Sequence, residues 1–188
     1  MARRAVPSTL ALCFGHHAVV AACLSVVTDY STLTARGATD GDAGLLRSLA
    51  PNCAPLDVHT PYTYWVLSHM FGRDCFIAYD GDIPAGFATS VISGKSALLW
   101  QIGVLPGYRG FGVSQLLIDA VVVNARRLGR WTVETSIDPE NTASHAAFTR
   151  YAREHKLVLA PAGSVDLVDE LDPGFRELET LYKLVLIG

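Results

Sequence analysis

Apolar and polar residues follow two periods along the chain, and the clearest change between them lies between residues 98 and 119. An apolar and aromatic run from Leu98 to Val104 is typical of a buried strand. After Pro106 and a glycine-rich turn, apolar residues recur at helical spacing and predict a helix that begins at or near Gly112. This arrangement points backbone N–H groups at one spot that suits an anion, most often a phosphate. The alternative is a glycine turn that only joins the two elements.

The same periods predict the elements on either side of this centre. Before it we expect strands over 31–38, 75–79 and 83–91, and helices from Thr39 or Asp40 to about Leu49 and after Thr60-Pro61. After it we expect a strand over 131–136, a helix over 141–155, and strands over 156–160 and 178–185. The segment between the last two strands is rich in Pro, Gly and Asp, which predicts a mobile loop.

Helices interleaved with mainly antiparallel strands predict an α/β domain. Its central sheet is expected to be mixed, with helices on both faces. The helix after Thr60-Pro61 is expected to carry one apolar face. That face would hold Tyr62, Trp65, Val66, His69 and Met70.

Length and composition predict one ordered domain. Of the 188 residues, 50% are hydrophobic and 18% are charged, which argues against disorder. The net charge of −3 gives no support to a nucleic-acid surface. The four cysteines have neither metal-ligand nor redox spacing, so we expect free thiols, a cytoplasmic location and no metal site.

Residues 1–30 differ from the rest, and we interpret them as an N-terminal extension that precedes a single domain over 31–188. Two arginines are followed by apolar residues that Gly15, His16 and His17 interrupt. The alternative is a signal peptide with a short apolar region from Ala18 to Val27. The apolar run is too short and too interrupted for a membrane-spanning helix, and no membrane association is expected.

The glycine loop has neither the lysine and Ser/Thr of a P-loop nor the spacing G-x-G-x-x-G. The run Arg109-Gly110-Phe111-Gly112-Val113-Ser114 instead resembles the acyl-CoA loop of the GNAT superfamily of N-acyltransferases, Q/R-x-x-G-x-G/A, with Ser114 where Gly or Ala is usual. The resemblance implies acetyl-CoA as co-substrate. The residues it would assign to binding are Arg109, Gly110, Phe111, Gly112, Val113 and Ser114 of the loop, the strand residues Ile102 and Val104, and Asn141 for the pantetheine arm.

Four further stretches, between about Thr34 and Leu184, resemble the L-2,4-diaminobutyrate acetyltransferases of ectoine biosynthesis. They are residues 38–43, 55–64, 100–104 and 134–144. The second stretch matches P-L-D-x-x-[ST]-x-Y-x-Y, which general acyltransferases lack. The ending Glu179-Thr180-Leu181-Tyr182-Lys183 resembles that family's E-x-L-Y-R, although Arg176 stands where a histidine is usual.

The resemblance implies that Asp57, Tyr62 and Glu179 hold a diamino acid and that Trp100 lines the pocket. Without it, Asp57 reads as a turn cap, Tyr62 as part of a helix face, Glu179 as an ion-pair partner and Trp100 as a core residue. The substrate amine must lose a proton before it attacks the thioester, because alkyl ammonium groups titrate near 10. Candidate bases are Glu134, Glu179 and Tyr62, in no fixed order.

Two further expectations concern the leaving group and the assembly. A main-chain N–H near Gly103 or Val104 would polarise the thioester carbonyl. Many superfamily members have a tyrosine that protonates the thiolate where this chain has Phe148, so either the thiolate leaves unprotonated or another group serves. A homodimer is possible. The alternatives to a diaminobutyrate acetyltransferase are an acyltransferase of another small amine or amino acid and a non-catalytic acyl-CoA-binding module.

Overall fold

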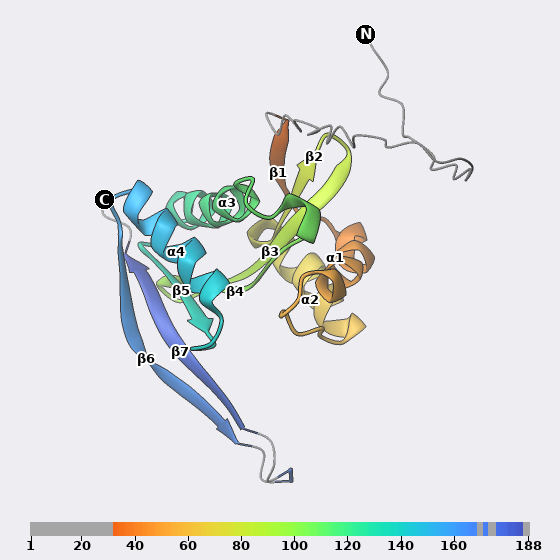
Figure 1. Ribbon diagram of the computed structural model, residues 1–188. Coiled ribbons are helices and arrows are strands. Elements are labelled where there is room, and N and C mark those ends of the chain that lie inside the picture. Colours follow the sequence, from red (N-terminus) through yellow and green to blue (C-terminus); the bar gives the residue numbers. More distant parts are fainter. Residues whose placement is uncertain (1–31, 169–170, 173–175, 186–188) are drawn as a thin grey trace, which may run out of the picture.

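The computed structural model describes residues 32–168, 171–172 and 176–185, which form a seven-stranded sheet and four α-helices (Figure 1). The strands are β1 (Leu33–Gly37), β2 (Phe76–Asp80), β3 (Ile83–Ser93), β4 (Ser96–Val104), β5 (Thr132–Ile137), β6 (Val158–Val168) and β7 (Arg176–Val185). The helices are α1 (Ala43–Leu49), α2 (Pro61–Phe71), α3 (Val113–Arg127) and α4 (Thr142–Glu154). The predicted extension over 1–30 lies outside the described residues.

The strands are ordered β1-β2-β3-β4-β5-β7-β6 across the sheet. Neighbouring strands pair antiparallel, except that β4 and β5 pair parallel. This confirms the predicted mixed, mainly antiparallel sheet. The parallel pair lies in the middle because α3 carries the chain from the end of β4 back to the start of β5.

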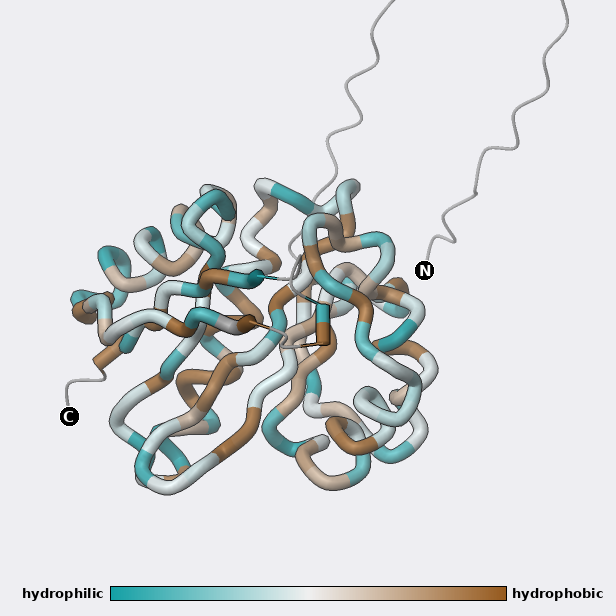
Figure 2. Tube along the Cα trace, turned by 90° about the horizontal axis from the view of Figure 1, so that it is seen from below, coloured by the Kyte–Doolittle hydropathy of each residue, from teal (hydrophilic) through white to brown (hydrophobic). Residues whose placement is uncertain are grey.

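Alternate residues of the strands point into two hydrophobic cores, one on each face of the sheet. Ala78 of β2 and Ala88 of β3 pack with α3 and α4, whereas their neighbours Ile77 and Phe87 pack with α1 and α2 on the opposite face. Hydrophobic residues therefore lie mainly on the strands in the middle of the molecule and on the helix sides that face them (Figure 2). The prediction of helices on both faces is confirmed.

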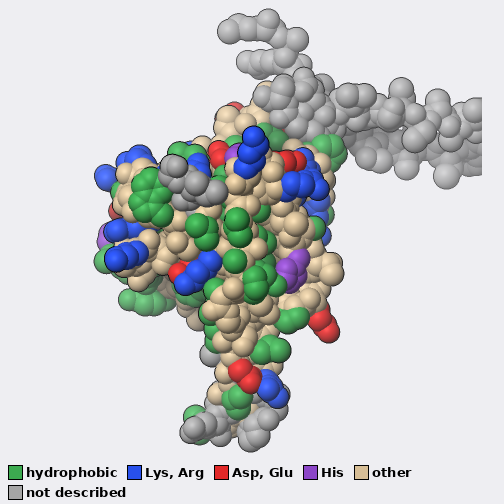
Figure 3. Space-filling view, turned by 90° about the vertical axis from the view of Figure 1, so that its left-hand side faces the viewer, with side chains coloured by type: hydrophobic (Ala, Val, Ile, Leu, Met, Phe, Trp, Pro, Cys, Tyr) green, Lys and Arg blue, Asp and Glu red, His purple; other side chains and the backbone are tan. Residues whose placement is uncertain are grey.

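The predicted loop over 161–177 is mostly strand. β6 and β7 pair from Val158 with Val185 to Val168 with Arg176, and this long hairpin projects as a narrow arm beyond the helices (Figures 1 and 3). Pro161 is tolerated because β6 is the edge strand, and the register shifts between Pro161 and Gly163. The predicted mobile loop is thus wrong over the described part of this segment.

Helix α2 buries a different face from the one expected. Tyr64 and Leu67 are fully or almost fully buried against β3 and α1, whereas Tyr62 is 70% exposed and Met70 66% exposed. Both faces of the helix carry aromatic residues at helical spacing, so periodicity alone could not select the buried one.

Among the described helices, none is long and apolar enough to cross a membrane.

Cys53 and Cys75 are both free and buried, as expected for reduced thiols. Burial raises the pKa of the Cys75 thiol to about 12. Cys13, Cys23 and the adjacent histidines near the N-terminus lie outside the described residues.

Candidate active site

The parallel strands β4 and β5 pair over only three residues each, from Ser96 with Thr132 to Leu98 with Glu134, although both strands continue. Gln101 N donates to Thr89 Oγ1 at 3.2 Å and Leu105 N donates to Ala85 O at 3.0 Å, so alternate N–H groups of β4 face β3. The N–H groups of Ile102 and Val104 therefore face the other edge, beyond the end of the β4–β5 ladder. This edge offers backbone donors to an extended ligand.

The glycine loop follows this edge directly. Gly110 and Gly112 have φ values of +83° and +89°, which favour glycine, and a Cβ at either position would meet no atom within 4 Å. Gly112 precedes α3, and the first intrahelical bond runs from Leu116 N to Gly112 O. The N–H groups of Val113, Ser114 and Gln115 are therefore left for an anion at the positive end of the helix dipole.

A cavity of about 210 Å³ lies between this loop and α4. Its lining residues are Gly110, Gly112, Ser114, Gln115, Ala143, Ala146, Ala147 and Arg150. Small side chains on α4 leave the space open, and Arg150 also lines it, with 2.8 Å between its Nε and Oε1 of Glu154. The residues present thus fit an acyl-CoA pyrophosphate, the group that the loop is predicted to bind.

Two predicted cofactor residues also serve the fold. Arg109 donates from Nε to Val104 O at 3.2 Å and from Nη2 to Ala54 O at 2.8 Å, so its guanidinium ties the loop to β4 and to the segment before Asp57. Asn141 is the N-cap of α4, and its Oδ1 accepts from Ser144 N at 3.0 Å. The amide NH2 at the other end of the Asn141 side chain is the group that could donate to a ligand.

On the substrate side, a β-bulge turns two consecutive residues of β4 toward α1 and α2. Thr89 pairs with Gln101 while Ser90 pairs with Leu99, so Trp100 is the extra residue.

The two residues at the bulge contact the segment around Asp57. Gln101 Nε2 donates to the main-chain oxygen of Asp57 at 2.9 Å. The indole of Trp100 lies 5.0 Å from the His59 ring, centroid to centroid. The bulge thus brings Trp100 beside the segment that contains Asp57.

Glu179 lies one residue beyond the point where β7 leaves β5, next to Ser136. Its Oε2 atom is buried and has no hydrogen-bond partner within the described residues. Burial raises the pKa of Glu179, and the negative charges of Glu177, Asp138 and Asp57 add to this, while a Ser136 hydrogen bond opposes it. The charge of Asp57 is therefore felt at Glu179, and a bound ammonium would relieve the repulsion between them.

The structure does not bring all the candidate bases together. Glu134 lies on the same face of the sheet but is paired with Lys183, its direct neighbour on β7, with 3.5 Å between Oε1 and Nζ. Tyr62 stacks on Trp65 of the same helix, 5.6 Å between ring centroids, and is largely exposed. Its phenol is not joined by a hydrogen bond to Glu179 or Asp57 within the part of the chain that the structure describes.

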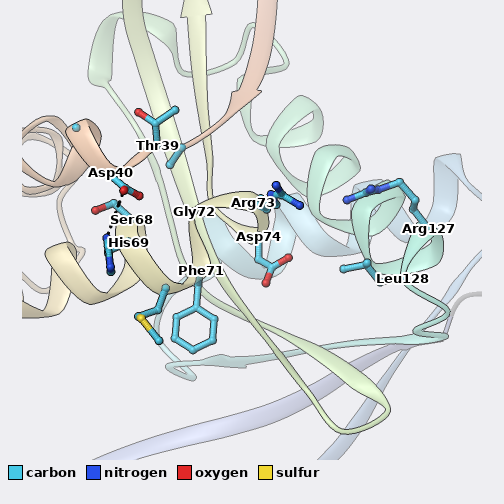
Figure 4. Close-up of a pocket in the computed structure, with 13 residues that line it drawn as sticks. Thr39, Asp40, Ser68, His69, Phe71, Gly72, Arg73, Asp74, Arg127 and Leu128 are labelled. Carbon is cyan, nitrogen blue, oxygen red and sulfur yellow. Dashed lines mark ion pairs between the residues drawn. The ribbon is translucent and has the colours of Figure 1, made fainter.

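A second cavity, of about 730 Å³, lies at the other ends of α2 and α3 (Figure 4). Most of its lining residues lie at or just beyond the C-terminal ends of these helices, where backbone carbonyls and not N–H groups are unpaired, and this does not suit a pyrophosphate. The other lining residues are residues 38–41. Several of its charged side chains pair locally: His69 lies 3.4 Å from Asp40, and Asn124 links Asp74 to Arg127. We do not assign acetyl transfer to it.

Taken together, the open edge of β4, the glycine loop and the buried carboxylate can bind a thioester on one side and a cationic amine on the other. Sequence reasoning missed Gln101 and Gln115, two glutamines whose Oε1 atoms are buried without a partner among the described residues. Gln101 belongs to a stretch that resembles the family, but no periodic pattern reveals the bulge that points it toward Asp57.

Comparison with known proteins agrees with this geometry. Residues 45–152 match the acetyltransferase (GNAT) family. L-2,4-diaminobutyric acid acetyltransferase of Shouchella clausii is 34% identical over 134 residues, which cover 70% of this chain and 74% of that protein. The protein of the same name from Streptomyces coelicolor is 32% identical over 148 residues, or 76% of this chain and 86% of that protein.

Solved structures show the same architecture. Diaminobutyrate acetyltransferase EctA from Paenibacillus lautus, in complex with its substrate L-2,4-diaminobutyric acid and coenzyme A, superposes with a TM-score of 0.68 and 25% identity, covering 81% of this chain and 94% of that one. The ribosomal-protein-S18-alanine N-acetyltransferase of Escherichia coli has a TM-score of 0.63 at 14% identity over 83% of this chain and 96% of that one, so it shares the fold alone. The chain therefore belongs to the GNAT family of acetyltransferases, in the group of the L-2,4-diaminobutyric acid acetyltransferases.

Proposed function

We propose that this protein transfers an acetyl group from acetyl-CoA to the side-chain amine of L-2,4-diaminobutyrate, a step of ectoine biosynthesis. Relatives that carry this name at 32–34% identity support the substrate. Within the site, the observation that carries the proposal is the buried and unpartnered carboxylate oxygen of Glu179, within electrostatic range of Asp57. Two carboxylates at one site suit a substrate with two ammonium groups.

On the cofactor side, the chain supplies mainly hydrogen-bond donors. Backbone N–H groups at Val113, Ser114 and Gln115 would hold the pyrophosphate, and Asn141 would hold the pantetheine arm. Bound acetyl-CoA supplies an activated thioester carbonyl. The N–H groups of Ile102 and Val104 would polarise that carbonyl as charge develops on its oxygen. No cysteine is required as a nucleophile, and Cys53 and Cys75 are buried.

On the substrate side, the two carboxylates would have different tasks. Asp57 would hold the α-ammonium, which stays charged throughout. Glu179 would face the side-chain amine and take its proton at Oε2, directly or through a water. The raised pKa of Glu179 brings it closer to the working range of a general base than an ordinary glutamate.

The leaving thiolate has no hydroxyl donor at the position where many superfamily members have a tyrosine. Phe148 occupies this position and is buried in the core between α3 and α4. The nearby Tyr151 hydroxyl donates to Asp119 at 2.8 Å, and burial together with this bond raises the pKa of Tyr151. We therefore propose that the thiolate leaves unprotonated and takes its proton from solvent.

The proposal is tested with the purified protein, acetyl-CoA and a panel of amines. Thiol release should be fastest with L-2,4-diaminobutyrate, and NMR of the product should show acetylation of the side-chain nitrogen. Faster turnover of another amine would favour the acyltransferase of a different substrate. Binding of acetyl-CoA without turnover of any amine would favour a non-catalytic module.

Two finer parts of the proposal concern the setting of the enzyme. A role in osmoprotection predicts that deletion of the gene lowers growth at high salt and that supplied ectoine restores it. We also propose a cytoplasmic location, because acetyl-CoA and diamino acids are available there, and a homodimer, which light scattering of the full chain would test.

A further inference from the structure

Gln101 has a buried carboxamide of which only one end is bonded. The residue is 4% exposed, and its Nε2 donates to the main-chain oxygen of Asp57 at 2.9 Å. A carbonyl oxygen can only accept, so the end of the carboxamide that faces Asp57 must be the NH2 group. The end without a partner among the described residues is therefore an acceptor, Oε1. A buried acceptor without a donor is costly, which makes this a place where a donor is expected.

The bulge in β4 places this acceptor on the substrate side of the sheet. Ala97 and Leu99 before it, and Ile102 and Val104 after it, pack toward α3. Trp100 and Gln101 lie between them and turn the other way, toward Asp57. On the same side of the sheet, Glu179 Oε2 is also buried without a partner among the described residues, and it lies within electrostatic range of Asp57.

The two amino groups of a diamino acid must bind at different places in the site, because only one of them reacts. The reacting amine must reach the thioester at the open edge of β4, where the N–H groups of Ile102 and Val104 lie. The Gln101 side chain is bonded instead to the main-chain oxygen of Asp57, the residue proposed to hold the α-ammonium. The α-ammonium does not react and keeps its charge, so its N–H donors can bond a neutral acceptor in the ground state and the transition state alike.

We propose that Gln101 is a substrate-binding residue that determines specificity for an α-amino group. Its Oε1 accepts a hydrogen bond from the α-ammonium of the diamino acid, while its Nε2 stays bonded to the main-chain oxygen of Asp57. This inference rests on the proposed function. A ligand without the α-ammonium leaves Oε1 buried and unpaired, and a site of this kind rejects such analogues strongly.

Two single-amine analogues of diaminobutyrate test the assignment. L-2-Aminobutyrate retains the α-ammonium, and 4-aminobutyrate retains only the side-chain amine. In Gln101→Met, the KM for diaminobutyrate and the inhibition constant of L-2-aminobutyrate should each rise roughly tenfold or more. The inhibition constant of 4-aminobutyrate should stay within about twofold. Equal shifts for all three compounds would mean that Gln101 only supports the fold, and would overturn the inference.

A second variant separates the two ends of the carboxamide. Gln101→Glu keeps an acceptor in the same place but loses the donor to Asp57, so the melting temperature should fall while L-2-aminobutyrate still binds at least as well as to the wild type. If Gln101→Met does not fold, Gln101→Glu decides, because loss of L-2-aminobutyrate binding in the folded variant overturns the inference. Gln115→Met is the matched control, since Gln115 has the same unpartnered oxygen in the cavity beside the glycine loop. It should leave the ratio of the two inhibition constants unchanged.

Failure of this inference can be told apart from failure of the proposed function. Wild-type protein that does not acetylate diaminobutyrate would contradict the proposed function itself. Wild-type protein that acetylates diaminobutyrate, combined with an unchanged ratio of inhibition constants in Gln101→Met, would contradict only the role of Gln101.

Discussion

Glu134 and Lys183 lie directly opposite each other on β5 and β7, with 3.5 Å between Oε1 and Nζ. Glu179 is on the same face of β7 but four residues before Lys183, about 13 Å along the strand. One amine therefore cannot lie beside both carboxylates. Glu134 already has a cationic neighbour, whereas an oxygen of Glu179 is buried without a partner among the described residues.

We therefore expect the two glutamates to respond differently to the same substitution. Glu179→Gln should raise the KM for diaminobutyrate by about tenfold to a few hundredfold and lower kcat, because a charge-assisted hydrogen bond and the proposed base are lost. Glu134→Gln should change kcat/KM by less than about fivefold, the effect of losing a partly exposed ion pair. Steady-state kinetics with both substrates varied would check this, and a larger loss in Glu134→Gln would transfer the role of base to Glu134.

Substitution of the loop glycines should abolish acetyl-CoA binding. Gly110→Asp and Gly112→Asp would each place a carboxylate in the open space that the pyrophosphate is proposed to fill. Calorimetry should detect no binding at concentrations that saturate the wild type.

Gly129→Asp is a matched control for backbone strain. Gly129 has a φ of +70° and open space around it, as the loop glycines do, but it lies beyond the other end of α3. It should lose a similar amount of stability and still bind acetyl-CoA. If Gly112→Asp and Gly129→Asp bind equally well, the loop does not hold the cofactor.

Much of the fold could be predicted because local signals and tertiary structure agree. The strand ending at Val104, the glycine turn and the helix from Val113 lie where the apolar periods placed them. The extent of β6 was missed because Pro161 and Gly163 ordinarily end a strand. An edge strand tolerates both, but the position of a strand within the sheet is a tertiary property that no local pattern carries.

The candidate site was harder to predict than the fold. Resemblance to the family pointed to Asp57, Trp100 and Glu179, and the structure places Trp100 and Glu179 on the side of the sheet where Asp57 lies. Gln101 lies in a stretch that resembles the family, but the sequence could not show its orientation, because a bulge changes which face a strand residue occupies without leaving a signal in the alternation of residues. Nor could it show that Tyr62 is mostly exposed, since that depends on which side of α2 meets the sheet.

Arg109 provides a test of how the loop is held. Its side chain bonds two main-chain oxygens, of Val104 and Ala54, so Arg109→Met should lower the free energy of unfolding by about 1–3 kcal/mol. The KM for acetyl-CoA should rise with it, because the loop loses its link to β4. Arg109→Lys should restore little, since an ammonium cannot span both acceptors in one plane. Thermal unfolding and kinetics together check this: weaker acetyl-CoA binding at unchanged stability would show that Arg109 contacts the cofactor itself.

The raised pKa of Glu179 also predicts how the stability of the protein depends on pH. Burial and neighbouring carboxylates raise its pKa in the folded protein above the unfolded value of about 4.3. Below about pH 4.3 the Glu179 carboxyl group is protonated in both states, so it does not change the free energy of unfolding. As the pH rises from there through the raised pKa, the folded state holds the proton more tightly than the unfolded state, so the free energy of unfolding falls. Above the raised pKa, the free energy of unfolding stays lower by the full cost of ionising Glu179 in the folded state.

Glu179→Gln should therefore melt at a higher temperature than the wild type at pH 7.5 and at nearly the same temperature at pH 4. Glu140→Gln, an exposed residue in the turn before α4, corrects for the change in net charge. Saturating diaminobutyrate at pH 7.5 should stabilise the wild type more than Glu179→Gln, because the substrate ammonium offsets the penalty only where the carboxylate is present. A Glu179→Gln protein that is less stable than the wild type at pH 7.5 would show that the carboxylate is already paired in the free enzyme.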